Sequence, residues 1–182
     1  MDELKETKIS TQYMFHGCVV NVRVDQAVQA DGKEVVREVV EHPGGVSIAM
    51  EDEEGKFFVV TQWRYALGRV SKEFPAGKKE AGEDPFETAR REIIEETGFE
   101  GEGFVRLGQM VPTGAYDTEI VDLYYCRKGR HIGQHLDADE NLYLATMTLD
   151  EIIEEALAGS LDDGKTVMSA FLIKERKAKG ML

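Results

Sequence analysis

The chain has 182 residues, of which 42% are hydrophobic, so it is long enough to bury one substantial core as a single domain. Its 35 acidic and 22 basic residues give a formal net charge of −13, which disfavours contact with the phosphate backbone of a nucleic acid. The charged opening segment lacks the apolar core of a signal peptide, and no later run approaches the roughly 20 apolar residues of a membrane span. We therefore expect a cytoplasmic protein that binds neither membrane nor nucleic acid.

A β-hairpin is predicted near the start of the chain. Residues 11–29 carry strand character, and a turn at residues 30–33 leads into a return strand at residues 35–41. Cys18 lies in the first strand and Cys126 in a later one. Because the two form no CxxC motif, we interpret both as buried small hydrophobic residues rather than as a disulfide.

A second hairpin follows the first. Residues 42–45, which read His-Pro-Gly-Gly, interrupt the strand pattern. Residues 46–50 then begin a strand, residues 53–56 form a turn, and residues 57–64 form the return strand.

Both ends of the next element, a helix, carry sequence signals. Asp84 is a suitable N-terminal cap, Pro85 suits the first helical position, and Gly98 is a typical stop. Between them, Phe86 and Ile93 belong to a set of apolar residues at helical spacing. One face of this helix is therefore predicted to be buried.

The other side of the helix is acidic. Glu92, Glu95 and Glu96 project from one stripe, because successive helical residues are about 100° apart. Like charges at this spacing destabilise a helix slightly. The stripe is either a solvated face or a site for a hard divalent cation such as Mg²⁺ or Mn²⁺, which prefers oxygen ligands.

The stretch from Gly77 to Phe99 resembles the signature of the Nudix hydrolase family, G-x5-E-x7-R-E-U-x-E-E-x-G-U, where U is aliphatic or aromatic. Every defined position agrees: Gly77, Glu83, Arg91, Glu92, Ile93, Glu95, Glu96, Gly98 and Phe99. The resemblance implies a loop-helix-loop that binds divalent cations and cleaves a nucleoside diphosphate linked to another moiety.

The resemblance also implies roles for individual residues. The metal ligands are expected among Glu92, Glu95, Glu96 and the backbone carbonyl of Ala76, with Mg²⁺ as the ion and Mn²⁺ as a possible substitute. Glu95 and Arg91 are expected among the catalytic residues. A role in orienting the neighbouring glutamates by hydrogen bonding suits Arg91 better than direct contact with the substrate.

Three further segments, residues 37–44, 62–65 and 73–77, resemble the ADP-ribose and nucleotide-sugar pyrophosphatase branch of the family. For residues 1–42, the resemblance implies an N-terminal hairpin region that helps to build the partner's active site in a homodimer. Residues 43–182 correspond to the catalytic core, and the whole chain is expected to form a single Nudix domain.

The same branch implies a set of substrate contacts. Arg37 and Arg64 are expected to bind the diphosphate or the nucleotide, because a planar guanidinium suits phosphate oxygens. Glu73 is assigned to the substrate site as well. Trp63 or Tyr65 is suited to stack on a base. The alternatives are solvated arginines on a strand, and aromatic side chains that belong to the core or to an interface.

Two more strands are predicted at residues 104–111 and 120–126, followed by a loop at residues 128–139. Between the strands lies Val-Pro-Thr-Gly-Ala-Tyr, where the branch often has Ser-Pro-Gly, and this departure leaves ADP-ribose and GDP-sugars both open. The segment around Glu140 resembles a mobile acidic loop that supplies a catalytic glutamate. Glu140 is therefore expected to be the general base, a metal ligand or both, unless it is only a solvated acid.

The chain closes with a strand at residues 142–147, a helix at residues 150–158 capped by Thr148, and a last helix at residues 166–177. This order of elements predicts an α+β or α/β/α arrangement on a mixed sheet, and the Nudix fold is such a sandwich.

The expected function is metal-dependent hydrolysis of the pyrophosphate bond of a nucleoside diphosphate sugar, such as ADP-ribose or GDP-mannose. The alternatives are a Nudix-fold sensor that binds a nucleotide sugar without cutting it, and a hydrolase of a dinucleoside polyphosphate.

Overall fold

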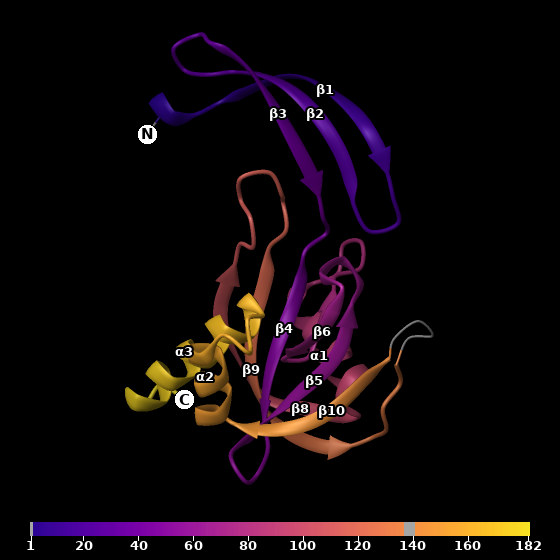
Figure 1. The fold of residues 1–182 in the computed structure, drawn as a ribbon, viewed down its shortest axis with the longest axis vertical. Coiled ribbons are helices and arrows are strands. Elements are labelled where there is room, and N and C mark those ends of the chain that lie inside the picture. The colour runs from indigo at the N-terminus through magenta and orange to yellow at the C-terminus, as the bar shows by residue number, and fades with distance from the viewer. Residues whose placement is uncertain (1, 137–140) are drawn as a thin grey trace. The chain divides into compact units, whose positions relative to one another are not determined.

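The computed structural model of this protein describes residues 2–136 and 141–182, and Figure 1 labels its three helices and most of its strands. Contacts within the chain define two compact units: Met1–Gly44 with Val111–Ile120, and Gly45–Met110 with Val121–Leu182. In the part of the chain that is described, no helix has both the length and the apolar character needed to cross a membrane.

The first unit contains a three-stranded antiparallel sheet in the order β1-β2-β3, preceded by a short 3-10 helix. Its elements are η1 (Asp2–Leu4), β1 (Thr7–His16), β2 (Asn21–Val28) and β3 (Glu34–Glu41). The predicted hairpin is confirmed as β2 and β3, which pair antiparallel. The single strand predicted before its turn was wrong, because another turn divides that stretch into β1 and β2. In that turn, the N–H of Gly17 donates to the carbonyl of Val20 at 3.0 Å.

The two cysteines differ in burial. Cys18 is exposed in the turn after β1, so its predicted burial was wrong, whereas Cys126 is buried as predicted. Both thiols are free.

The second unit is built on a sheet of seven strands, and the prediction that this sheet is mixed is confirmed. Strands run in the order β10-β5-β4-β9-β8, with β6 added to β5 and β7 added to β4. The bounds are β4 (Gly45–Glu51), β5 (Lys56–Arg64), β6 (Arg69–Glu73), β7 (Ala76–Lys78), β8 (Phe99–Met110), β9 (Val121–His131) and β10 (Leu142–Thr148), and the 3-10 helix η2 (Tyr65–Leu67) follows β5. Within this sheet β4 pairs parallel with β9 and antiparallel with β7. The predicted loop from residue 128 was wrong at its start, because β9 continues to pair with β8 as far as His131.

All three predicted helices are confirmed. They are α1 (Pro85–Thr97), α2 (Leu149–Ala158) and α3 (Gly164–Ala178). The carboxylate of Asp84 accepts the N–H of Phe86 at 2.9 Å and caps α1. Thr148 caps α2 in a capping box with Glu151. Asp163 caps α3, which explains why that helix begins before the expected residue 166.

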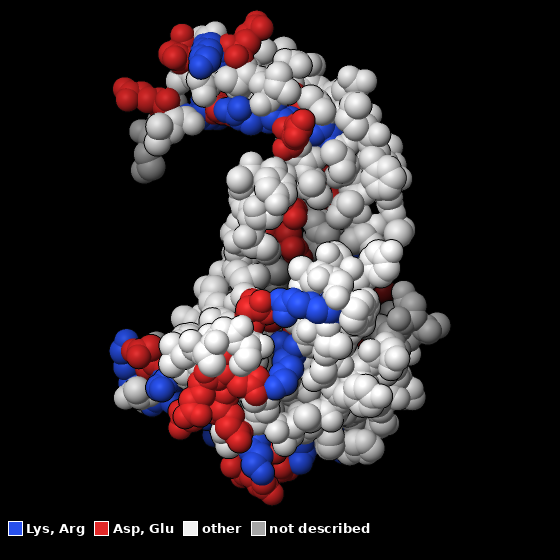
Figure 2. Space-filling view, viewed as in Figure 1, with Lys and Arg blue, Asp and Glu red and all other residues white. Residues whose placement is uncertain are grey.

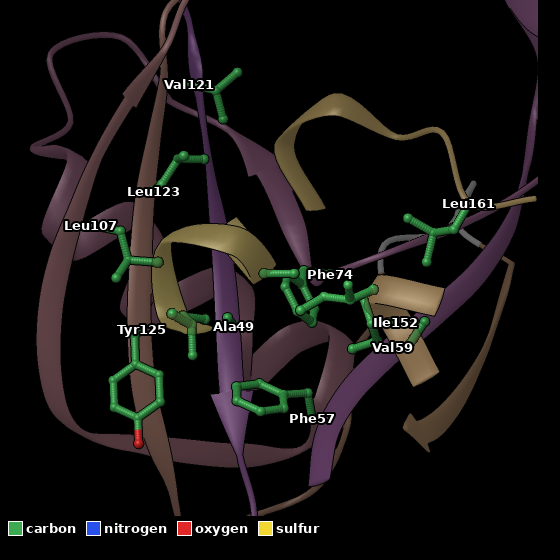
Figure 3. Close-up of a cluster of buried hydrophobic side chains, with 13 residues drawn as sticks. Ala49, Phe57, Val59, Phe74, Leu107, Val121, Leu123, Tyr125, Ile152 and Leu161 are labelled. Carbon is green, nitrogen blue, oxygen red and sulfur yellow. The ribbon is translucent and has the colours of Figure 1, made fainter. Parts of the chain in front are cut away.

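Two hydrophobic clusters lie on opposite faces of the sheet, because successive side chains of a strand point to opposite sides. Leu123 and Tyr125 of β9 join the cluster that α2 and α3 cover, part of which is drawn in Figure 3. Tyr124 and Cys126 join the other cluster, which contains Ile93 of α1. The second unit is therefore an α/β/α sandwich, and α1 lies on the opposite face from α2 and α3.

Acidic and basic side chains lie close together on the face of the second unit that Figure 2 shows. Figure 2 shows acidic side chains gathered over the region of α2 and α3, with basic side chains among them. One such pair joins Lys72 Nζ to Glu155 Oε1 at 2.7 Å. Exposed ion pairs of this kind contribute little stability individually.

Candidate active site

Helix α1 buries two of the glutamates of the acidic stripe. Glu92 is 7% exposed and Glu96 is 1% exposed, whereas the side chain of Glu95 is 29% exposed. Glu92 and Glu96 are one helical turn apart and lie on the same side of the helix. A solvated face is therefore the wrong interpretation for these two residues, since a buried carboxylate needs hydrogen bonds or opposite charge.

Strand β7 holds the backbone that meets these carboxylates. The N–H of Ala76 donates to Glu96 Oε2 at 3.0 Å. A Cβ atom placed on Gly77 would lie 1.8 Å from Glu92 Cδ. A side chain at residue 77 would therefore have to displace the carboxylate of Glu92, which Arg91 holds in place. The same backbone packs closely on β4, where a Cβ on Gly45 would lie 2.7 Å from the carbonyl oxygen of Gly77.

Arg91 connects three glutamates around the start and middle of α1. Its Nη1 donates to Glu92 Oε1 at 2.7 Å and to Glu95 Oε2 at 2.8 Å. Its Nε and Nη2 donate to the two carboxylate oxygens of Glu83 at 3.1 and 3.0 Å. Hydrogen bonds from Arg91 lower the pKa of Glu83 to about 2, and those that Glu83 accepts raise the pKa of Arg91. The guanidinium thus fixes the directions of its carboxylate neighbours.

The donor atoms of this region fit a hard divalent cation in type. Carboxylate oxygens of Glu92 and Glu96 lie against the backbone at Ala76 and Gly77, and oxygen is the donor that Mg²⁺ and Mn²⁺ prefer. Within residues 2–136 and 141–182, no three side chains of His, Cys, Asp or Glu form a preformed metal cluster. Glu95 is instead turned toward Arg91.

An open cleft of about 450 Å³ brings together three predicted substrate contacts, Trp63, Arg64 and Glu73. Its walls come from the end of β5, from η2 and β6, and from the start of α3. Trp63 is 57% exposed and Tyr65 is 92% exposed, so both rings are free of the core. Exposed aromatic rings beside arginine are suited to contact a base and a phosphate group.

Glu73 is buried at the base of this cleft, between two cations. It accepts hydrogen bonds from Arg64 Nε at 2.7 Å, from Arg64 Nη2 at 2.5 Å and from Lys165 Nζ at 2.5 Å. Burial alone would raise the pKa of Glu73, but Arg64 and Lys165 outweigh it and lower the pKa to about 2.

The cleft and the acidic helix influence each other electrostatically. The pKa of Arg64 is raised mainly by its hydrogen bonds to Glu73, and to a smaller extent by the charges of Asp163 and Glu96.

The contact of Lys165 with Glu73 joins residues 92 positions apart in the chain. Sequence reasoning missed Lys165 and Asp163, because a turn before a helix carries no local signal for such a contact.

Two predicted site residues are not among those described above. Arg37 belongs to the first unit, where it donates to Glu6 through Nε at 2.8 Å and through Nη2 at 2.5 Å. Glu140 lies outside the described residues. The other predicted site residues all belong to the second unit.

Comparisons with known proteins agree with this geometry. The model of the NUDIX domain matches residues 41–169. The chain is 31% identical over 180 residues to the ADP-ribose pyrophosphatase of Bacillus subtilis (strain 168), covering 98% of this chain and 97% of that protein. It is 35% identical over 176 residues to the methanol dehydrogenase activator of Bacillus methanolicus, covering 96% and 95%. A crystal structure of an ADP compounds hydrolase shares the fold, with a TM-score of 0.83 and 17% identity over 98% of this chain and 97% of that one.

Proposed function

This chain belongs to the Nudix hydrolase family, and from that premise we propose that it hydrolyses the pyrophosphate bond of a nucleoside diphosphate sugar. With ADP-ribose as the substrate, water adds to one phosphorus and the products are AMP and ribose 5-phosphate. The extensive similarity to a protein named ADP-ribose pyrophosphatase makes ADP-ribose the first candidate. GDP-mannose is the second.

The observation that carries the proposal is the buried pair of carboxylates on α1, placed against β7. Glu92 and Glu96 are nearly inaccessible, yet they are acidic, and a helix that needed only a core would have apolar residues there. The neighbouring cleft supplies an arginine and exposed aromatic rings. Carboxylates for a cation beside a guanidinium for phosphate are what pyrophosphate hydrolysis requires.

In this proposal the residues of the second unit have separate tasks. Arg64 binds the diphosphate through the donors that face the cleft, Glu73 holds that guanidinium, and Trp63 stacks on the base. Arg91 orients Glu92 and Glu95.

We assign Mg²⁺, or Mn²⁺ in its place, to Glu92, Glu95, Glu96 and the carbonyl of Ala76. When bound, the ion neutralises phosphate charge and lowers the pKa of the attacking water. We assign acceptance of the proton from that water to Glu140, which lies outside the described residues.

We also propose a homodimer in which the first unit, including Arg37, contributes to the partner's site. Support comes from β1, an edge strand whose ten residues are all exposed, among them Ile9, Met14 and Phe15. An exposed, apolar edge strand invites pairing with another chain. Light scattering after size exclusion should show a dimer that Ile9→Glu converts to a monomer; a monomeric wild-type protein would contradict this.

We further propose a cytoplasmic location and a small-molecule substrate rather than nucleic acid. The formal net charge of −13 supports the choice of substrate, because a strongly acidic protein repels long polyanions.

The proposal is tested by turnover of ADP-ribose, GDP-mannose, ADP-glucose and diadenosine tetraphosphate in the presence of Mg²⁺, with the products identified by phosphorus NMR. Release of a nucleoside monophosphate and a sugar phosphate is the expected result. Reaction in ¹⁸O-labelled water then identifies the phosphorus attacked. Tight binding without turnover would favour the sensor, and preference for the dinucleotide would favour the polyphosphate hydrolase.

A second candidate function is activation of a dehydrogenase. It is favoured by the 35% identity to a protein named methanol dehydrogenase activator over nearly the full length of both chains. The test is to add the chain to an alcohol dehydrogenase and follow NADH formation. If stimulation of the dehydrogenase requires the hydrolytic residues, activation depends on hydrolysis. If a hydrolytically inactive variant also stimulates it, activation is independent of hydrolysis.

A further inference from the structure

Lys165, at the start of α3, is a cation that reaches the base of the cleft from a distant part of the chain. Its side chain is 13% exposed. Its Nζ donates to Glu73 Oε2 at 2.5 Å and to Asp163 Oδ1 at 2.7 Å. Burying the ammonium is tolerated because two carboxylates surround it.

The position of Lys165 is fixed by the N-terminus of its helix. Asp163 Oδ2 accepts the N–H of Thr166 at 3.0 Å and its hydroxyl at 2.6 Å. The hydroxyl oxygen of Thr166 in turn accepts the N–H of Phe74 at 2.8 Å. Since Phe74 directly follows Glu73, the start of α3 is anchored to the segment that carries the buried carboxylate. Lys165 therefore meets Glu73 in a defined geometry.

Two cations and two carboxylates meet around Glu73. Arg64 and Lys165 both contact Glu73, and Lys165 also contacts Asp163, so the charges of these four groups balance only while Lys165 is present. The side chain of Arg64 is 39% exposed and faces the cleft, whereas that of Lys165 is only 13% exposed. Arg69, another cation of the cleft wall, is paired with Asp162 at 2.5 Å. Of the two cations that contact Glu73, Arg64 is thus the one that is more accessible to a ligand in the cleft.

We propose that Lys165 is a positioning residue for substrate binding, which neutralises Glu73 and so leaves the charge of Arg64 for the diphosphate. Without Lys165, the guanidinium alone must neutralise a buried carboxylate, and less of its charge is available to an incoming phosphate. This inference rests on the proposed function, because it takes the cleft to be the place where the diphosphate binds.

The first test is steady-state hydrolysis of ADP-ribose with Mg²⁺ by the wild-type protein, Lys165→Met, Lys165→Arg and Lys174→Met. Lys174 is a matched control, because it lies on the same helix with a side chain that is 51% exposed and is outside the cleft wall. We expect Lys165→Met to raise KM about tenfold with little change in kcat, as loss of a buried charge contact predicts. Lys165→Arg, which keeps the charge, should restore KM, and Lys174→Met should leave it unchanged.

The second test does not depend on turnover. Binding of α,β-methylene ADP-ribose, whose bridging oxygen is replaced by CH₂, is measured by calorimetry with Mg²⁺ for the same four proteins. We expect about tenfold weaker binding for Lys165→Met only, which corresponds to about 1.4 kcal/mol. If Lys165→Met does not fold, Lys165→Gln takes its place with the same expectation.

The two tests separate the two claims. A wild-type protein that binds the analogue but does not cleave ADP-ribose would contradict the proposed function, and the binding series would still test Lys165. Equal KM and affinity for Lys165→Met and Lys174→Met, or failure of Lys165→Arg to restore binding, would overturn the role of Lys165. So would a wild-type protein that binds no analogue.

Discussion

The acidic helix and the cleft both bury glutamate, but they neutralise it differently. In the cleft, Glu73 contacts two cations, Arg64 and Lys165. On α1, the relation is reversed, because Arg91 contacts three glutamates and Glu96 accepts a backbone N–H. Among these contacts, carboxylates outnumber cations on α1, which favours a divalent cation. In the cleft, two cations balance Glu73 and Asp163, and the exposed guanidinium of Arg64 is suited to phosphate. Two short stretches of one fold thus provide complementary halves of a site for a metal-bound diphosphate.

Removing a carboxylate from the acidic helix should have the largest effect. We expect Glu96→Gln to lower kcat by about three orders of magnitude, because a bound metal ion contributes several kcal/mol to the transition state. Glu87→Gln is the matched control on the same helix, since the side chain of Glu87 is 58% exposed and pairs with Arg90. If the two variants have equal activity at saturating Mg²⁺, the proposal that Glu96 of α1 takes part in the reaction is contradicted.

Glu73, the buried glutamate of the cleft, should make the stability of the fold depend on pH. The pKa of Glu73 is lowered from 4.5 to about 2, so the ionised group stabilises the fold above pH 4.5 and this stabilisation is lost as the pH falls toward 2. We expect Glu73→Gln to lower the free energy of unfolding by about 3 kcal/mol at neutral pH, and by progressively less between about pH 5 and pH 2. Urea unfolding at a series of pH values measures the difference. A difference that does not change with pH would contradict the assigned pKa.

Filling the space between β7 and α1 with a methyl group should have a smaller effect on activity than removing a carboxylate. In Gly77→Ala the new methyl group must displace the carboxylate of Glu92, so we expect kcat to fall about tenfold to a hundredfold and stability to fall by about 2 kcal/mol. Gly114→Ala is the control, because the added Cβ there would lie 3.2 Å from Val111 Cγ1, compared with 1.8 Å from Glu92 Cδ at Gly77. Kinetics and thermal unfolding of both variants check this prediction, which fails if Gly77→Ala behaves like the control.

A cap distant from both regions should have the smallest effect. Thr148→Ala removes the side-chain oxygen that accepts the N–H of Glu151 at 3.2 Å and starts α2. We expect a loss of about 1 kcal/mol in the free energy of unfolding and no change in kcat or KM. This variant measures how far a general loss of stability affects the kinetics. A change in KM here would mean that the cleft variants cannot be interpreted by charge alone.

The elements with local signals were predicted well. The cap at Asp84 and the stop at Gly98 define α1, and the capping box at Thr148 defines α2. The turn at Gly17 was missed because the residues around it have strand character, and the turn is defined by the hydrogen bond to Val20 and by the pairing of β1 with β2. The extension of β9 to His131 was missed for a related reason, since pairing with β8 overrides glycine at position 129.

The amino-acid sequence by itself determined the acidic helix, its ends and the family signature, because caps and one-turn spacing act between residues close in the chain. It also identified Arg64, Trp63 and Glu73, which the structure places in one cleft. Only the tertiary structure decided that Glu92 and Glu96 are buried against β7 and that Lys165 shares Glu73 with Arg64. Those contacts depend on which strands pair and on where α3 packs, and both are settled by burial of the whole core rather than by any local pattern.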